Sequence, residues 1–175
     1  DGSADPSVDP KIDPSRLLLA YRHMRRLRML DARMILLQRQ GRVGFYGACT
    51  GQEAVPIATG LVAREDDWVF PALREQSVML VRGFPLQRFV AQVFGNSGDL
   101  LKGRQMPSHP SGKQVHQVSW SSCIGPQIPQ AVGAAWAMKQ ARREPGAVAF
   151  GFCGDGATSQ PDFHAAMTFA SAWKV

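Results

Sequence analysis

Apolar side chains recur every three or four positions from residue 15 to residue 40, the spacing that places them on one face of an α-helix. That face consists of Leu17, Tyr21, Met24, Leu27, Leu30, Met34 and Ile35. Ser15 is predicted to cap the first turn, and Gly41 is predicted to end the helix. We therefore predict a helix over 15–40 whose Met- and Leu-rich face packs into a core.

Further along the chain, helical spacing alternates with short apolar runs that are typical of strands. We predict helices at 51–63, 75–82, 86–94, 127–142 and 160–173, and strands at 68–70 and 147–152. The strand at 147–152 is apolar on both faces and leads directly into a helix. This favours a parallel sheet with helices on both faces, and hence an α/β fold.

The segments outside this pattern suggest how the chain is organised. Residues 1–14 are rich in Asp and Pro and are predicted to form a flexible N-terminal arm, with the N-terminal portion of one domain over 15–175. Residues 95–126 are rich in Gly, Ser, Pro and His, and a connection of this length is usually functional or disordered. The sequence lacks an initial Met and a helix-to-strand pattern is still running at Val175, so we expect a truncated piece of a longer protein.

The bulk composition describes an ordinary globular protein, with 45% hydrophobic and 19% charged residues. The net charge of +6 comes largely from arginines in the first predicted helix, where such charges usually form a solvated face. Basic residues do not alternate with aromatic ones, so no nucleic-acid partner is expected. A contact with membrane is not expected either, because no apolar run approaches the ~20 residues that a span needs.

The cysteine pattern bears on the compartment. Cys49, Cys123 and Cys153 are odd in number and far apart, and no C-x-x-C pair occurs. They are expected to be reduced thiols, not a disulfide framework or a zinc site. The acidic, Pro-rich start does not have the pattern of a secretory or transit signal. A bacterial cytoplasm or a mitochondrial matrix is the expected location.

The clearest candidate for chemistry follows the strand at 147–152. Gly154-Asp155-Gly156 stands between that strand and the helix predicted from residue 160. Glycines let backbone approach phosphate oxygens, a helix N-terminus favours an anion, and a carboxylate can hold the divalent cation that bridges them. Alternatively, Asp155 satisfies backbone donors in an ordinary turn. A nicotinamide-binding turn is disfavoured, because Ser159 stands at the third glycine position of G-x-G-x-x-G.

Together with other segments, this motif makes the sequence resemble the alpha subunits of thiamin-diphosphate-dependent 2-oxo acid dehydrogenases. The segments that carry the resemblance lie in family order over residues 16–175. They are Tyr21-Arg22-His23-Met24, Gln38 to Tyr46, Gly51-Gln52-Glu53-Ala54, Gly103-Arg104-Gln105-Met106-Pro107, Gln127 to Ala135, Gly154 to Ser159, and Asp162-Phe163-His164. The loop at 103–107 and the pair Ser121-Ser122 are most similar to the branched-chain type, whereas 51–54 is also found in the pyruvate type.

The resemblance implies a thiamin-diphosphate-binding fold and oxidative decarboxylation of branched-chain 2-oxo acids, with transfer of the acyl group to a lipoyl arm. It implies a beta subunit in an alpha2-beta2 heterotetramer, and a lipoyl-bearing acyltransferase component as a further partner. Alternatives are a pyruvate or acetoin dehydrogenase alpha subunit, or a non-catalytic assembly subunit of the same fold. The small residues at 131–135 are expected either in tight core packing or at a subunit contact.

The resemblance also implies which residues bind the cofactor: Arg74, Ser122, Ile124, Asp155, Gly156 and Ala157. Asp155 would hold Mg²⁺, and Arg74 would pair with the diphosphate, for which a planar guanidinium is well suited. Ser122 and Ile124 would flank the cofactor rings. The alternatives are a surface ion pair of Arg74 with Glu75 or Asp67, and ordinary loop packing for Ser122 and Ile124.

Other positions carry weaker implications. A potassium loop would include Ser121, Cys123 and Gln127, although Pro126 stands where the branched-chain type has a Thr whose hydroxyl can bind the ion. His109 is kept as a candidate catalytic contact, while His116 and His164 are expected to be surface or structural residues. The main general base, a glutamate, is expected on the beta subunit.

Two further departures from the family weaken the expected cofactor site. Leu73 replaces the Tyr that precedes the arginine in the branched-chain type, which removes a hydroxyl contact to phosphate. In the family, a later Asn completes the magnesium site, and no Asn follows Gly156 here. We therefore expect this chain to hold half of the metal site, to bind cofactor poorly and to be inactive alone.

Overall fold

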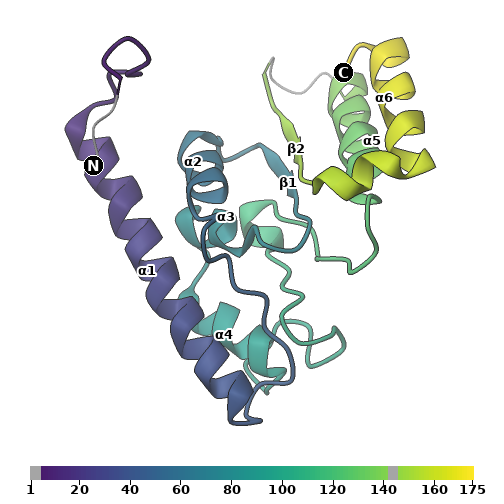
Figure 1. The fold of residues 1–175 in the computed structure, drawn as a ribbon. Coiled ribbons are helices and arrows are strands. Elements are labelled where there is room, and N and C mark those ends of the chain that lie inside the picture. The colour runs from purple at the N-terminus through teal and green to yellow at the C-terminus, as the bar shows by residue number, and fades with distance from the viewer. Residues whose placement is uncertain (1–4, 142–145) are drawn as a thin grey trace.

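The computed structural model describes residues 5–141 and 146–175 (Figure 1). Its helices are α1 (Pro14–Arg39), α2 (Ala54–Val62), α3 (Gln76–Val81), α4 (Leu86–Phe94), α5 (Gln127–Gln140) and α6 (Pro161–Trp173). Two short 3₁₀ helices, η1 (Lys113–Val115) and η2 (Asp155–Ser159), and two strands, β1 (Trp68–Phe70) and β2 (Ala149–Gly151), complete the list. The helical and strand pattern in the sequence therefore located every regular α-helix and strand to within a few residues.

The two strands are parallel, as predicted, with Val69 opposite Phe150. Residues 116–118 run along the other side of β1, where Val69 donates its N–H to the His116 carbonyl and accepts from Val118. Asp67, which is 2% exposed, ties the strand starts together because its carboxylate accepts from the backbone N–H of Val148 at 2.7 Å. The carboxyl ends of three parallel segments therefore open at one edge of the molecule.

Helices pack around this small sheet in two groups. The largest apolar cluster joins the C-terminal half of α1 to α3 and α4 through buried side chains such as Met34, Met79 and Phe89. Helices α5 and α6 pack on each other through Ile128, Val132 and Ala166. In Figure 1, α1 runs along one side of the molecule, and the α5–α6 pair lies next to β2 on the other.

The prediction that both faces of the sheet are covered holds for β1 and not for β2. Val69 and Phe70 are buried, whereas Gly151 is exposed and the other β2 residues are half-buried. Helix α5 covers one face of β2, since a Cβ added at Gly151 would lie 3.1 Å from the Cβ of Ala131. Among the described residues, β2 is an edge strand, which explains its incomplete burial.

The predicted helix caps are wrong at both ends of the chain. Asp13, not Ser15, caps α1, because its carboxylate accepts the Ser15 backbone N–H at 2.8 Å and Pro14 takes the first helical position. At the start of α6, Ser159 and Asp162 have the S-x-x-acid spacing that predicts a capping box, and this box does not form. Ser159 belongs to η2, and Gln160 precedes α6 without a side-chain cap.

Two predictions fall partly outside the described residues. The helix predicted over 127–142 ends at Gln140, and position 142 is not described. Residues 5–13 of the predicted arm are exposed and contain a turn in which Val8 donates to the Asp5 carbonyl, while positions 1–4 lie outside the description. No helix in the described part of the chain is both long and apolar enough to cross a membrane.

Candidate functional site

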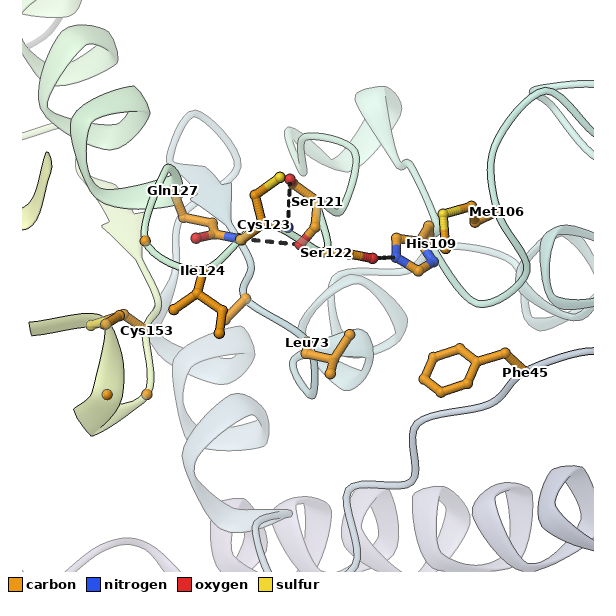
Figure 2. Close-up of a pocket in the computed structure, with 15 residues that line it drawn as sticks. Phe45, Leu73, Met106, His109, Ser121, Ser122, Cys123, Ile124, Gln127 and Cys153 are labelled. Atoms are coloured by element: carbon orange, nitrogen blue, oxygen red, sulfur yellow. Dashed lines mark hydrogen bonds between the residues drawn. The ribbon is translucent and has the colours of Figure 1, made fainter. Parts of the chain in front are cut away.

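The loops that follow the three parallel segments enclose a cavity of about 460 Å³ (Figure 2). Its wall includes residues 72–73 after β1, 121–125 and Gln127 before and at the start of α5, and 153–154 and 156–157 after β2. In open α/β sheets, ligands bind at this end of the strands. The position of the cavity therefore follows from the parallel pairing of β1 and β2.

The cavity is lined mainly by apolar side chains. Phe45, Leu73, Met106 and Ile124 surround it, and Ile124 is 67% exposed although it is aliphatic. In Figure 2, Ile124 lies between Cys153 and Leu73, and Phe45 comes in from a different part of the chain. An exposed aliphatic side chain in a concave apolar wall is suited to contact a ligand.

A second cavity of about 480 Å³ adjoins the first and shares Ala72, Leu73, Cys153 and Gly154 with it. It adds polar groups, among them the side chain of Arg74. An apolar cavity and a cavity lined by a positively charged arginine thus share the loops that follow β1 and β2. Such a pair is suited to a ligand with an aromatic part and an anionic part.

Arg74 is exposed and is oriented by neighbouring backbone. Its Nη1 donates to the Ala48 carbonyl, and its backbone N–H donates to the Glu75 carboxylate at 3.1 Å. The ion pair with Glu75 or Asp67 that was the alternative does not form; the ion pairs within the described residues are Arg28–Glu53 and Arg64–Asp66. Among the described residues, the guanidinium makes no other hydrogen bond, and Arg74 lines the second cavity.

Glu75 lines the same cavity, and burial raises the pKa of its carboxyl group above the usual value. Backbone N–H donors, that of Arg74 first among them, oppose this shift. A carboxyl group with a raised pKa is protonated, and therefore neutral, over a wider pH range. A neutral carboxyl group repels an anionic ligand less than a carboxylate does.

Asp155 opens the 3₁₀ helix η2, which lies between β2 and α6. Its neighbours Gly154 and Gly156 line the first cavity, and Asp155 itself is exposed beside it. A Cβ added at Gly154 or Gly156 would meet no heavy atom within 4 Å, so both glycines leave open space along the backbone. No group of three or more His, Cys, Asp or Glu side chains in the described chain converges for a metal ion.

His109 is 4% exposed and lines the cavity from the side of the long loop. Its Nδ1 lies 2.9 Å from the Pro107 carbonyl oxygen, and its Nε2 is hydrogen-bonded to the Ser122 hydroxyl (Figure 2). The structure therefore brings two predicted site residues into direct contact. His116 stacks on Trp68 at 4.9 Å, and His164 is exposed on α6, so neither lines this cavity.

Within the predicted potassium loop, the side chain of Gln127 is hydrogen-bonded to the loop backbone. The Gln127 amide donates to the carbonyls of Ser121, at 3.4 Å, and Cys123, at 3.3 Å. The Cys123 N–H donates to the Ser121 hydroxyl at 3.2 Å. The side chain of Gln127 therefore already contacts two carbonyl oxygens of the loop, and potassium stays a prediction without a derived role.

A buried polar network supports the wall from behind. Asp31, 1% exposed, accepts from the Tyr46 hydroxyl and from the Cys49 N–H, each at 2.7 Å. The Cys49 thiol in turn donates to the Arg74 carbonyl at 2.6 Å. Asp31 therefore connects α1 to the loop that carries Arg74.

Sequence reasoning missed part of the wall. It assigned no role to Phe45, Met106 or Cys153, although Phe45 and Met106 lie within segments that carried the family resemblance. Leu73 was noted only as a departure, and it lines both cavities. Of the predicted cofactor residues, Ser122, Ile124, Gly156 and Ala157 line the first cavity, and Arg74 lines the second.

Comparison with known proteins gives consistent matches. A model of the family described as "Dehydrogenase E1 component" matches residues 21–175. The chain is 38% identical over its full length to the 2-oxoisovalerate dehydrogenase subunit alpha of Pseudomonas aeruginosa, of which it covers 42%. It is 41% identical, over 95% of its length, to the mitochondrial subunit alpha of Homo sapiens, covering 37% of that protein. For subunit alpha 2 of Arabidopsis thaliana the identity is 42% over 89% of the chain, which covers 32% of that relative. The chain therefore spans roughly two fifths or less of each of these relatives.

Proposed function

The chain belongs to the dehydrogenase E1 component family, and on that premise we propose that it is the cofactor-anchoring part of a branched-chain 2-oxo acid dehydrogenase alpha subunit. Its fold would be the N-terminal portion of a thiamin-diphosphate-binding fold. The relatives named above carry the name 2-oxoisovalerate dehydrogenase subunit alpha, in a bacterium and in mitochondria. We propose the corresponding locations, bacterial cytoplasm or mitochondrial matrix, for this chain.

The observation that carries the proposal is the pair of adjoining cavities. Thiamin diphosphate joins two heteroaromatic rings to a diphosphate, and the cavities offer an apolar compartment beside one that contains Arg74. The open space at Gly154 and Gly156 fits a close approach of phosphate to backbone. The residues present therefore fit the cofactor, and they fit Mg²⁺ only in part, through Asp155.

In this proposal each side chain has a physical task. The Arg74 guanidinium binds diphosphate oxygens, and the Asp155 carboxylate supplies one oxygen ligand to Mg²⁺. Ile124 and Leu73 exclude water from the rings and hold their orientation. When bound, the cofactor supplies the nucleophilic carbon and the electron sink for decarboxylation. The residues of this chain bind and orient the cofactor. The general base is proposed to come from the beta subunit.

The apolar lining of the first cavity supports the proposed substrate class. Phe45, Met106 and Ile124 offer apolar surface to the branched aliphatic side chain of a 2-oxo acid. The test is cofactor-dependent turnover by the natural-length alpha chain assembled with its beta subunit. Decarboxylation of 3-methyl-2-oxobutanoate is compared with decarboxylation of pyruvate and with cleavage of acetoin, which has no carboxyl group to lose. Preference for the branched acid supports the proposal. Preference for pyruvate or acetoin replaces the substrate class, and no turnover without cofactor binding favours the non-catalytic assembly subunit.

Replacing Arg74 tests the diphosphate contact. We expect Arg74→Ala to weaken thiamin diphosphate binding by about tenfold or more, because charge-assisted hydrogen bonds to phosphate are lost, and Arg74→Lys to recover part of this. Calorimetric titration of the assembled protein measures it. Arg88→Ala is the matched control, since Arg88 is an exposed arginine on α4 away from both cavities. An affinity of Arg74→Ala within twofold of the parent's would contradict the assignment.

Helix α5 offers a surface for the proposed beta subunit or a second alpha chain. Ala131 is buried against β2, whereas Gly133 is exposed and a Cβ there would meet nothing within 4 Å. Core packing therefore explains Ala131 and leaves Gly133 open to a partner surface. The acyltransferase component, as a bearer of the lipoyl arm, is proposed as a further partner of the assembled enzyme.

We expect Gly133→Leu to leave the fold of the chain intact and to prevent assembly, because a bulky side chain would separate two closely packed surfaces. Gly133→Ala is the control, and it should raise the stability of α5 by up to about 1 kcal/mol. Sedimentation of the co-expressed subunits measures assembly. A Gly133→Leu protein that still forms the heterotetramer would show that this face is not an interface.

A further inference from the structure

The two ring nitrogens of His109 have different partners. Nδ1 faces the Pro107 carbonyl oxygen at 2.9 Å, and a carbonyl oxygen can only accept. Nδ1 must therefore carry the ring proton. In the neutral imidazole, Nε2 is then an acceptor, and its partner is the Ser122 hydroxyl. The Ser122 proton consequently points toward His109 and away from the cavity.

The surroundings hold the ring in this orientation. His109 is 4% exposed, its ring meets Trp120 edge-on at 6.5 Å, and Phe45 lies on another side at 6.4 Å. The preceding residue, Ser108, is 2% exposed and has a left-handed φ of 59°. Turning the ring about its side-chain bond would remove the contacts of Nδ1 with Pro107 and of Nε2 with Ser122 inside a buried segment, which favours the observed orientation.

Ser122 differs from His109 in exposure. It is exposed and lines the first cavity, whereas its hydrogen bond to His109 is partly buried. Among the described residues, its hydroxyl makes no hydrogen bond besides the one to His109. Since the hydroxyl proton is engaged with His109, a ligand group that reaches this oxygen from the cavity meets only lone pairs.

We propose that His109 is a positioning residue that makes the Ser122 hydroxyl a hydrogen-bond acceptor toward the cavity, so that this wall selects a ligand group with an N–H donor. Within the proposed function, on which this part rests, the group is the pyrimidine amino group, which is the N–H donor of thiamin diphosphate. A carbonyl or carboxylate oxygen at the same place would face the Ser122 lone pairs and be disfavoured.

The first test needs no cofactor. Long-range proton–nitrogen NMR of the isotope-labelled chain, at alkaline pH where imidazoles are neutral, identifies which ring nitrogen of His109 is protonated. We expect the proton on Nδ1, and a change of the Nε2 shift in Ser122→Ala and not in Ser119→Ala, whose hydroxyl lies on an exposed residue outside the cavity. A proton on Nε2 would overturn the proposal, because the ring would then donate to Ser122.

The second test measures selectivity in the assembled alpha–beta protein with Mg²⁺. The probes are thiamin diphosphate and its oxo analogue, in which an oxygen replaces the pyrimidine amino group. We expect His109→Leu and Ser122→Ala each to lower the affinity ratio of the two probes by about tenfold, the effect of one mispaired polar contact. His109→Gln, whose amide oxygen can accept the Ser122 proton, should recover part of the ratio, and His164→Leu on exposed α6 should leave it unchanged.

A double-mutant cycle separates positioning from packing. In the Ser122→Ala background, His109→Leu should no longer change the ratio, because His109 acts through Ser122. Equal weakening of both probes by His109→Leu, in either background, would overturn the proposal in favour of a packing role. If the parent protein binds neither probe, the proposed function and the assignment of the pyrimidine amino group both fail. The NMR measurement still decides whether the His109–Ser122 hydrogen bond has the proposed direction.

Discussion

Replacing Asp155 with Ala should weaken the binding of thiamin diphosphate in the presence of Mg²⁺ by about 100-fold or more. A hard divalent ion prefers carboxylate and phosphate oxygens, and Asp155 is the carboxylate that stands between Gly154 and Gly156 beside the cavity. Loss of an inner ligand should cost more than the 10- to 100-fold typical of groups one shell further out. Calorimetric titration of the assembled protein measures the effect.

The same substitution should leave folding unchanged. Asp155 is exposed, and the hydrogen bond formed at this residue joins its backbone carbonyl to the Thr158 hydroxyl at 2.6 Å, which Ala retains. Asp162→Ala, an exposed acidic residue at the start of α6, is the matched control and should bind cofactor normally. Equal affinities of Asp155→Ala and the parent protein, with and without Mg²⁺, would remove Asp155 from the metal site.

Replacing Asp31 with Ala should lower the free energy of unfolding by about 3 kcal/mol. The substitution leaves the Tyr46 hydroxyl and the Cys49 N–H buried without their acceptor, and each such group costs about 1–3 kcal/mol. Urea denaturation measures the change. Asp66→Ala is the control, because its ion pair with Arg64 is half-exposed and should be worth less than about 1 kcal/mol. Similar losses for both variants would contradict the role assigned to the network.

Asp31 also predicts a pH dependence. Burial raises the pKa of its carboxyl group above the usual value, and the Glu53 charge adds to this, while hydrogen bonds from Tyr46 and Cys49 oppose it. The folded chain therefore holds the proton more tightly than the unfolded chain. This contribution to stability is complete below the unfolded pKa of about 4 and is lost as pH rises through the raised folded pKa. In Asp31→Asn, the free energy of unfolding should no longer decrease over this pH range. The same pH dependence of stability in the variant and the parent protein would contradict this role of Asp31.

Local pattern was sufficient where a short apolar run had clear boundaries. The strand at 68–70 was predicted without error, because Asp67 precedes the run and Pro71 ends it. Helix caps were predicted less well, because several neighbouring residues can cap a helix and the backbone geometry determines which one does. Asp13 competes with Ser15 for α1, and Pro161 shifts the start of α6 past Ser159.

The residues of the site likewise include some that local sequence predicts and some that it does not. Gly156, Ala157, Ser122 and Ile124 were predicted from motifs, and they meet because parallel strands bring their following loops to one edge. Phe45 joins them only through long-range contacts, such as the bond from Tyr46 to Asp31, which no local pattern encodes. The His109–Ser122 pair likewise depends on how residues 103–126 fold back on themselves.

The most direct test of the central claim is a crystal structure of the natural-length alpha chain assembled with its beta subunit, with thiamin diphosphate and Mg²⁺ bound. We predict that Mg²⁺ lies about 2.1 Å from an Asp155 carboxylate oxygen, with the diphosphate beside Arg74 and the rings between Leu73 and Ile124. A cofactor bound away from both cavities, or a diphosphate that contacts neither Asp155 nor Arg74, would contradict the account.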